Sequence, residues 1–170
     1  MTELLKDFIT GREIPHAGAE ANRQALERVL VNEKGYDKPD ILVDDPVEIT
    51  VNGEPYCSVA DLALCVGGKR IMVIKCAAGS LFSWEREILA AARLMAAYQI
   101  PLCAVSDGKD AVVFDTVSGK QIGEGLAALP SRQEAESFLS KTTLQPLPPA
   151  RREKTAWIFR SYDSMKVNRE

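Results

Sequence analysis

The sequence contains one histidine, no closely spaced cysteine pair and no long apolar run, and each absence argues against a class of protein. With His16 as its only histidine and no C-x-x-C pair among its four cysteines, the chain has no recognisable Cys/His zinc site or Ser-His-Asp site. No stretch approaches the ~18 consecutive apolar residues of a membrane span, and the first ten residues lack the pattern of a signal peptide. We therefore expect a cytoplasmic protein with reduced cysteines and no membrane partner.

Charge is unevenly distributed along an otherwise ordinary globular composition. The net charge of the 170 residues is −3. From Lys141 onward there are seven basic and three acidic residues, a net of +4, whereas residues 1–140 hold 14 basic and 21 acidic residues, a net of −7. The sequence predicts an acidic body over 1–140, a proline-rich linker over 141–149 and a basic C-terminal helix or tail over 150–170. This last helix is expected to dock on the body or on a second copy, which would make a homodimer.

Hydrophobic periodicity predicts an α/β fold. The order of elements is helix, three strands, helix and two or three further strands, which indicates a mixed central sheet flanked by helices. The predicted helices cover 20–33, 83–99, 132–139 and 150–164, and the predicted strands cover 47–51, 56–65, 70–78, 101–106, 111–115 and 120–123.

Two charged residues, Asp61 and Lys75, lie inside apolar strands that should pair as a hairpin. A three-residue loop, 67–69, would place Asp61 directly opposite Lys75, and a two-residue loop, 67–68, would place it opposite Ile74. Burying an unmatched charge is costly, which favours the first register. A structural ion pair, or strand ends close to solvent, remains an alternative to a functional site.

Three sequence features together resemble the N-terminal domain of type I restriction enzyme R subunits, a PD-(D/E)XK nuclease fold. The first is a helix that carries a Glu and is followed by E-K-G-Y, and the second is S-V-A-D-L-A-L followed by a hairpin and R-I-M-V-I-K-C-A-A. The third is a helix that runs into Q-I-P and a strand that ends in S-D-G-K-D. The resemblance covers roughly residues 18–125 and implies a restriction-endonuclease-like fold.

The resemblance also implies a site, from which this sequence departs. In that family a helix Glu, a strand Asp and an E-x-K motif build the site; the carboxylates hold Mg²⁺ and the Lys helps to activate water. The matching positions here are Glu20, Asp61, Lys75 and Ala77, so a Lys replaces the motif Glu and an Ala the motif Lys. We expect Lys75 to take the place of the metal by pairing with Asp61 and Glu20, in a site without Mg²⁺ or another cofactor.

Helical periodicity leaves a second interpretation of Glu20 open. It shares a stripe with Arg23, Gln24 and Glu27, away from the apolar face, and this stripe could be a solvated surface. His16, in a loop before this helix, is expected to be a plain loop residue.

The leading functional prediction is a catalytically degenerate nuclease-like domain that acts in nucleic-acid binding or assembly. One alternative is an active DNA endonuclease with a rearranged site, in which Lys75 supplies the amine and Mg²⁺ is held by Glu20, Asp61 and a third acid, Glu85 or Glu87. Another is a small dimeric interaction protein. If DNA binds, the expected phosphate contacts are Lys69, Arg70, Arg151 and Arg152, because the body is acidic; a solvated basic helix is the alternative for the tail.

Overall fold

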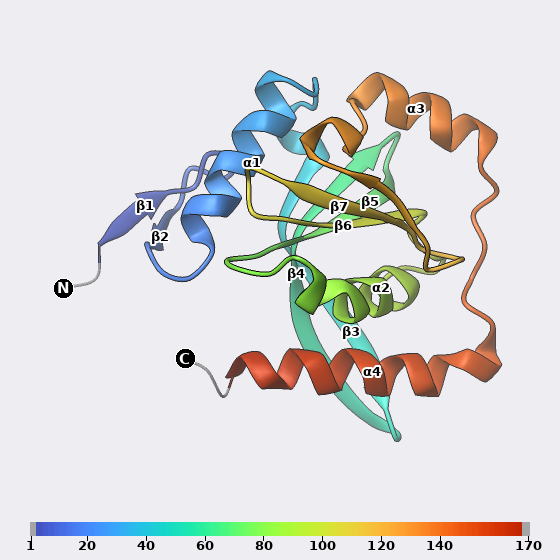
Figure 1. Cartoon of the computed structure of the whole chain (residues 1–170). Helices are drawn as coiled ribbons and strands as arrows, with labels where there is room; N and C mark the ends of the chain where they lie inside the picture. The colour runs from blue at the N-terminus through green and yellow to red at the C-terminus, as the bar shows by residue number, and fades with distance from the viewer. Residues whose placement is uncertain (1–2, 168–170) are drawn as a thin grey trace.

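A central six-stranded sheet with helices on both faces forms the body of the protein (Figure 1). The computed structural model describes residues 3–167. The sheet has the order β3 (Ile41–Val51), β4 (Glu54–Val66), β5 (Lys69–Cys76), β6 (Leu102–Ser106), β7 (Ala111–Asp115) and β8 (Gln121–Glu124). The β5 and β6 strands are parallel and the other neighbours are antiparallel. The predicted α/β fold with a mixed sheet is therefore confirmed.

Each face of the sheet carries its own hydrophobic core. On one face, α1 (Glu20–Asn32) and α3 (Arg132–Lys141) cover a core in which Leu26, Leu62 and Met72 are fully buried. On the other face, α2 (Glu85–Leu94) and α4 (Pro149–Val167) cover a second core. The α2 helix also provides the crossover that makes β5 and β6 parallel. Ser131 begins α3 with a capping box, as its place before the helix predicts.

The second predicted helix, 83–99, is shorter in the structure. A 3₁₀ turn over Phe82–Trp84 precedes α2, Trp84 occupies the N-cap position, and α2 ends at Leu94. The chain then turns, and the Ile100 N–H donates to the Ala92 carbonyl at 2.8 Å. The apolar stripe beyond Leu94 therefore packs on the core from a turn, which helical periodicity alone does not distinguish from a continued helix.

A small two-stranded sheet near the N-terminus was not predicted. It consists of β1 (Leu4–Lys6) and β2 (Glu13–Pro15), which pair antiparallel beside α1 (Figure 1). Three-residue strands are too short to show an alternating pattern, so the sequence gives no signal for them.

The C-terminal helix α4 docks on the body along α2 and β3. Helical periodicity in the sequence predicts that Trp157, Ile158, Tyr162 and Met165 share the side of this helix that docks. The buried apolar side chains of α4 are instead Ala156 and Phe159, and Trp157 is 44% exposed. The other residues predicted on the inward side are the partly buried Ile158 and Tyr162, and Met165, whose side chain lies outside the described residues, as do residues 168–170 of the predicted tail. A homodimer through this helix stays a prediction. In the part of the chain that the structure describes, no helix has both the length and the apolar character needed to span a membrane.

Candidate functional site

The β4–β5 hairpin brings Asp61 and Lys75 together by a route that the sequence did not indicate. Its loop has two residues, Gly67 and Gly68, both with positive φ (57° and 77°), as in a type I′ turn. The expected three-residue loop is therefore wrong. A β-bulge compensates for the difference. Cys65 pairs with Arg70, whereas the residue before it, Leu64, pairs with Met72. The register then continues to Leu62 opposite Ile74, which brings the next residues, Asp61 and Lys75, side by side.

The Asp61–Lys75 pair is partly buried. Lys75 Nζ lies 3.5 Å from Asp61 Oδ2, and the two side chains are 13% and 24% exposed. The Cys76 N–H donates to the same Asp61 oxygen at 2.8 Å. On its other side Lys75 Nζ lies 4.6 Å from the centre of the Trp84 ring, close enough for a cation–π contact. The Lys75 ammonium is thus held between a carboxylate and an aromatic ring.

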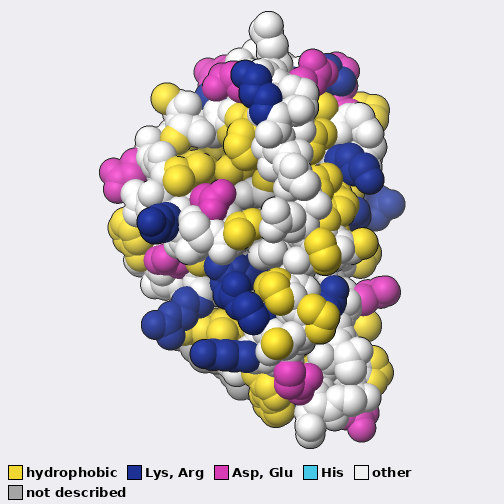
Figure 2. Space-filling model, turned by 90° about the vertical axis from the view of Figure 1, so that its right-hand side faces the viewer, with side chains coloured by type: hydrophobic (Ala, Val, Ile, Leu, Met, Phe, Trp, Pro, Cys, Tyr) yellow, Lys and Arg dark blue, Asp and Glu magenta, His cyan; other side chains and the backbone are white. Residues whose placement is uncertain are grey.

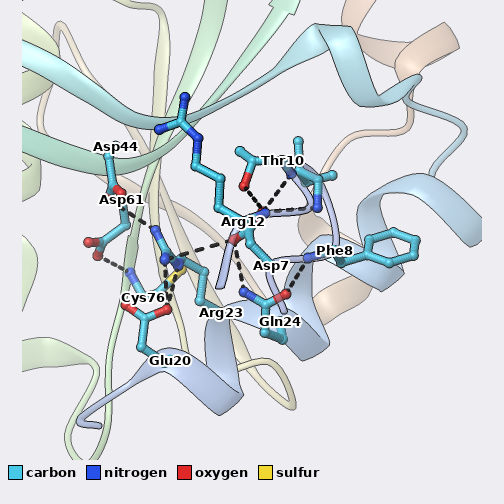
Figure 3. Close-up of polar contacts among 11 residues, drawn as sticks. Asp7, Phe8, Thr10, Arg12, Glu20, Arg23, Gln24, Asp44, Asp61 and Cys76 are labelled. Atoms are coloured by element: carbon cyan, nitrogen blue, oxygen red, sulfur yellow. Dashed lines mark hydrogen bonds and ion pairs between the residues drawn. The ribbon is translucent and has the colours of Figure 1, made fainter. Parts of the chain in front are cut away.

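Glu20 pairs with Arg23 instead of Lys75. Arg23 Nη2 lies 2.6 Å from Glu20 Oε2, and Arg23 Nη1 lies 3.0 Å from Asp44 Oδ1 (Figure 3). The Arg23 side chain is 5% exposed. Burial alone would lower the pKa of Arg23, but the charges of Glu20 and Asp44 outweigh this and raise it. The solvated-face interpretation of this helix stripe is therefore wrong: Arg23 is a second buried cation among carboxylates.

Arg23 and Asp44 are the residues of this cluster that sequence reasoning missed. Asp44 interrupts the apolar start of β3 and has a positive φ of 52°, and Val43 and Asp45 on either side pair with Leu62 and Ala60 of β4. Asp44 therefore lies on the strand next to Asp61. Two consecutive aspartates inside an apolar strand were the available signal: Asp45 is buried and pairs with Arg70, whereas Asp44 is 56% exposed and pairs with Arg23.

A third carboxylate, Asp7, anchors the N-terminal segment to this cluster. It accepts hydrogen bonds from the Ile9 and Thr10 N–H groups and, at 2.9 Å, from Gln24 Nε2. Arg23 Nη2 lies 3.8 Å from Asp7 Oδ2. Although burial opposes it, the hydrogen bonds from Thr10 and Gln24 lower the pKa of Asp7. Asp7 is thus held as a carboxylate at 1% exposure.

Glu27 lies fully buried behind Asp7 on α1. Neither of its carboxylate oxygens accepts a hydrogen bond from a donor among the described residues. Burial, followed by the negative charge of Asp7, raises the pKa of Glu27 to about 8. Two ionised carboxylates cannot share a hydrogen bond, but a protonated Glu27 can donate one to Asp7. Glu27 is therefore the member of this pair that carries the proton at neutral pH.

These residues do not fit the Mg²⁺ site that the resemblance implies. Among the described residues no group of three or more His, Cys, Asp or Glu side chains is placed to hold a metal ion. The position of the motif lysine is taken by Ala77, which has no amine, is 1% exposed and packs in the core next to α2. The other acids considered, Glu85 and Glu87, lie in the first turn of α2. His16 lies at the surface, with Nδ1 3.4 Å from Glu3 Oε2.

Of the basic residues predicted to contact phosphate, Lys69 and Arg70 lie at the β4–β5 turn. Arg70 makes a bidentate ion pair with the buried Asp45, at 2.6 and 2.9 Å. This hydrogen bonding, together with the charge of Asp45, raises the pKa of Arg70. The Lys69 Nζ lies 5.5 Å from the centre of the Tyr98 ring. The Arg70 charge is thus already neutralised within the fold.

The other two, Arg151 and Arg152, are exposed at the start of α4 and form no ion pair with a described residue. Arg93 on α2 lies near them: burial, and then the charge of Arg151, lower its pKa. Figure 2 shows Lys and Arg side chains gathered on the lower half of the face where α4 begins. We call Arg93, Arg151 and Arg152 the basic patch.

Comparison with known families assigns most of the body. The family model of the type I restriction enzyme R protein N terminus matches residues 18–130, more than half of the chain. This range includes Glu20, Asp61, Lys75 and Ala77. Comparison with curated proteins and with solved structures finds no match. Because the family match spans more than half of the chain, the chain belongs to the type I restriction enzyme R protein N-terminal family.

Proposed function

We propose that this chain is a degenerate PD-(D/E)XK nuclease domain that binds nucleic acid without cleaving it. The observation that carries the proposal is the 3.5 Å separation between Lys75 Nζ and Asp61 Oδ2. In a metal-dependent relative that Asp and the residue at position 75 would both be carboxylates. Here one of them is an ammonium, which neutralises the other and repels a divalent cation.

The neighbouring carboxylates support the same conclusion. Glu20 and Asp44 are both bound by Arg23, so a metal would have to displace a buried guanidinium to reach them. The amine that would activate water has no equivalent at Ala77. The two cations, Arg23 and Lys75, thus stabilise carboxylates that a metal would otherwise hold together.

The basic patch supports the nucleic-acid part of the proposal. The charge of Arg151 contributes to lowering the pKa of Arg93, and neither residue is in an ion pair with a carboxylate among the described residues. A phosphate backbone would neutralise both, and such contacts provide most of sequence-independent DNA affinity. The first turn of α4 contains no acidic residue, and Glu48 and Glu153 line a pocket together with Arg152.

A cleavage assay tests the loss of catalysis. We expect supercoiled plasmid and single-stranded DNA to stay intact when incubated with the wild-type chain and Mg²⁺ or Mn²⁺. Cleavage by the wild type that disappears in Asp61→Ala would contradict the proposal and support an active, rearranged site in which Lys75 supplies the amine.

A binding titration tests the nucleic-acid part. Fluorescence anisotropy with labelled duplex DNA should show binding that weakens with salt, and Arg151→Gln with Arg152→Gln should lower the slope of log K against log[salt] by about one per cation removed. The matched control, Lys109→Gln with Lys141→Gln, removes the same charge from exposed sites outside the patch. Equal losses in both pairs would show that net charge, and not the patch, controls binding.

A further inference from the structure

A hollow beside the end of α1 contains three cations and no acid. Its volume is about 460 Å³. The charged residues of its lining are Lys6, Arg28 and Lys38, and the rest is formed by Phe8, Ile9, Thr10 and Gly11. This concentration of positive charge is unexpected, because the body of the protein carries a net charge of −7. We call it the cationic hollow.

An aromatic ring positions two of these cations without neutralising them. Lys38 Nζ lies 4.4 Å from the centre of the Phe8 ring, and the Arg28 guanidinium carbon lies 5.3 Å from it. A cation–π contact orients a cation but supplies no negative charge. None of the three cations forms an ion pair with a described residue, and this includes Glu13, which faces Lys6 across the β1–β2 ladder. Three cations that form no ion pair with a described residue therefore line one hollow.

Buried hydrogen bonds fix the wall of the hollow. The Phe8 N–H donates to Gln24 Oε1 at 2.7 Å, and the Thr10 N–H donates to Asp7 Oδ1 at 2.8 Å. Asp7 and Gln24 are both buried, and in Figure 3 the Phe8 ring points away from Asp44 and Asp61. The segment between β1 and β2 is thus pinned to α1, so that the hollow is formed before any ligand arrives.

We propose that the cationic hollow binds phosphate groups. Three cations around one space suit a multiply charged anion, and an arginine can bind two phosphate oxygens at once. This inference goes beyond the proposed function, because it depends neither on the state of the Asp61–Lys75 pair nor on the basic patch. The phosphate can belong to a nucleic-acid backbone or to a small free anion, and the two sources differ in the experiment below.

Amide NMR titrations of the full chain provide the test. Inorganic phosphate and a short single-stranded DNA oligonucleotide are added separately, and we expect shifts at residues 6–11 and around Arg28 and Lys38 with at least one of them. Shifts with the oligonucleotide at much lower concentration identify a nucleic acid as the source, and equal or tighter binding of phosphate identifies a small anion. If neither probe shifts these amides, the proposal is overturned, whatever the cleavage assay shows.

Three variants separate the hollow from bulk charge. The triple variant Lys6→Gln, Arg28→Gln and Lys38→Gln should lose the shifts, whereas Lys109→Gln, Lys120→Gln and Lys141→Gln, which remove the same charge at exposed sites, should keep them. Phe8→Leu leaves every charge in place but removes the ring that positions two cations, and it should weaken binding several-fold while thermal unfolding shows an intact fold. Equal loss in both triple variants would also overturn the proposal.

Discussion

In the proposed degenerate site, Lys75 stands where a metal-dependent relative would have a carboxylate beside that of Asp61, and its surroundings show how the chain accommodates the exchange. Its ammonium contacts Asp61 and the Trp84 ring and neutralises the Asp61 carboxylate. The Arg23 guanidinium neutralises Glu20 in the same way. The cost of burying an unpaired charge was enough to predict the Asp61–Lys75 contact from sequence. It could not identify the partner of Glu20, since a helix stripe of charged residues looks the same whether it faces water or a buried cluster.

The Asp7–Glu27 carboxyl pair should make the stability of the fold depend on pH. The folded-state pKa of Glu27 is raised from 4.5 to about 8, so its proton is bound more tightly in the folded chain. Its contribution to stability is therefore full below about pH 4.5 and is lost as the pH rises toward about 8. Glu27→Gln keeps the shape of the side chain but cannot ionise. As the pH rises across this window, the free energy of unfolding of the variant should therefore increase relative to that of the wild type, by up to about 1.4 kcal/mol for each pH unit.

Denaturant unfolding at pH 5 and pH 8 measures this difference. Glu33→Gln, which removes an exposed carboxylate just beyond the same helix, should show the pH dependence of the wild type. The interpretation of Glu27 as the protonated partner fails if Glu27→Gln loses stability equally at both pH values. The charged groups that act on Glu27 are Asp7, Arg23 and Glu20, and all three remain in this variant.

At the scale of elements, α4 is joined to the sheet by a polar contact as well as by its apolar side chains. The buried Asp163 accepts hydrogen bonds from Tyr56 Oη at 2.5 Å and from Ser58 Oγ at 2.8 Å, both on β4. Removing the carboxylate would leave two hydroxyls without this acceptor. Asp163→Ala should therefore lower the free energy of unfolding by about 1–3 kcal/mol.

Thermal or denaturant unfolding tests this, with Ser164→Ala as the control, because Ser164 is the next residue on the same helix and is exposed. If the two variants are equally stable, Asp163 does not hold α4 on the sheet. Loss of α4 signals from the NMR spectrum of Asp163→Ala, with the sheet signals retained, would instead show that the helix detaches as a unit.

The elements also show what sequence patterns can and cannot determine. Strands β5, β6 and β7 are nearly continuous apolar runs in the middle of the sheet, and their positions were predicted closely. The bulge after Leu64 depends on how two strands fit together, so no pattern within one strand reveals it. The inward face of α4 was misassigned for a similar reason, because Trp157 and Phe159 are both apolar and only docking decides which is covered.

At the scale of the whole molecule, the structure shows where the acidic body and the basic tail, both predicted from charge, lie relative to each other. The tail lies along α2 and β3 and places Arg151 and Arg152 near Arg93 of the body. The cationic hollow lies elsewhere, at the end of α1. The family match covers residues 18–130 and so includes neither α4 nor the segment that carries Lys6 and Phe8. Both positively charged surfaces therefore depend partly on segments outside the shared domain.

The central claim is that a lysine occupies the place of the metal, and calorimetric titration with Mg²⁺ and Mn²⁺ tests it most directly. The wild type should give no saturable heat, and Lys75→Glu, which places a second carboxylate beside Asp61, should gain saturable binding. Saturable binding by the wild type that is abolished in Asp61→Ala would contradict the account.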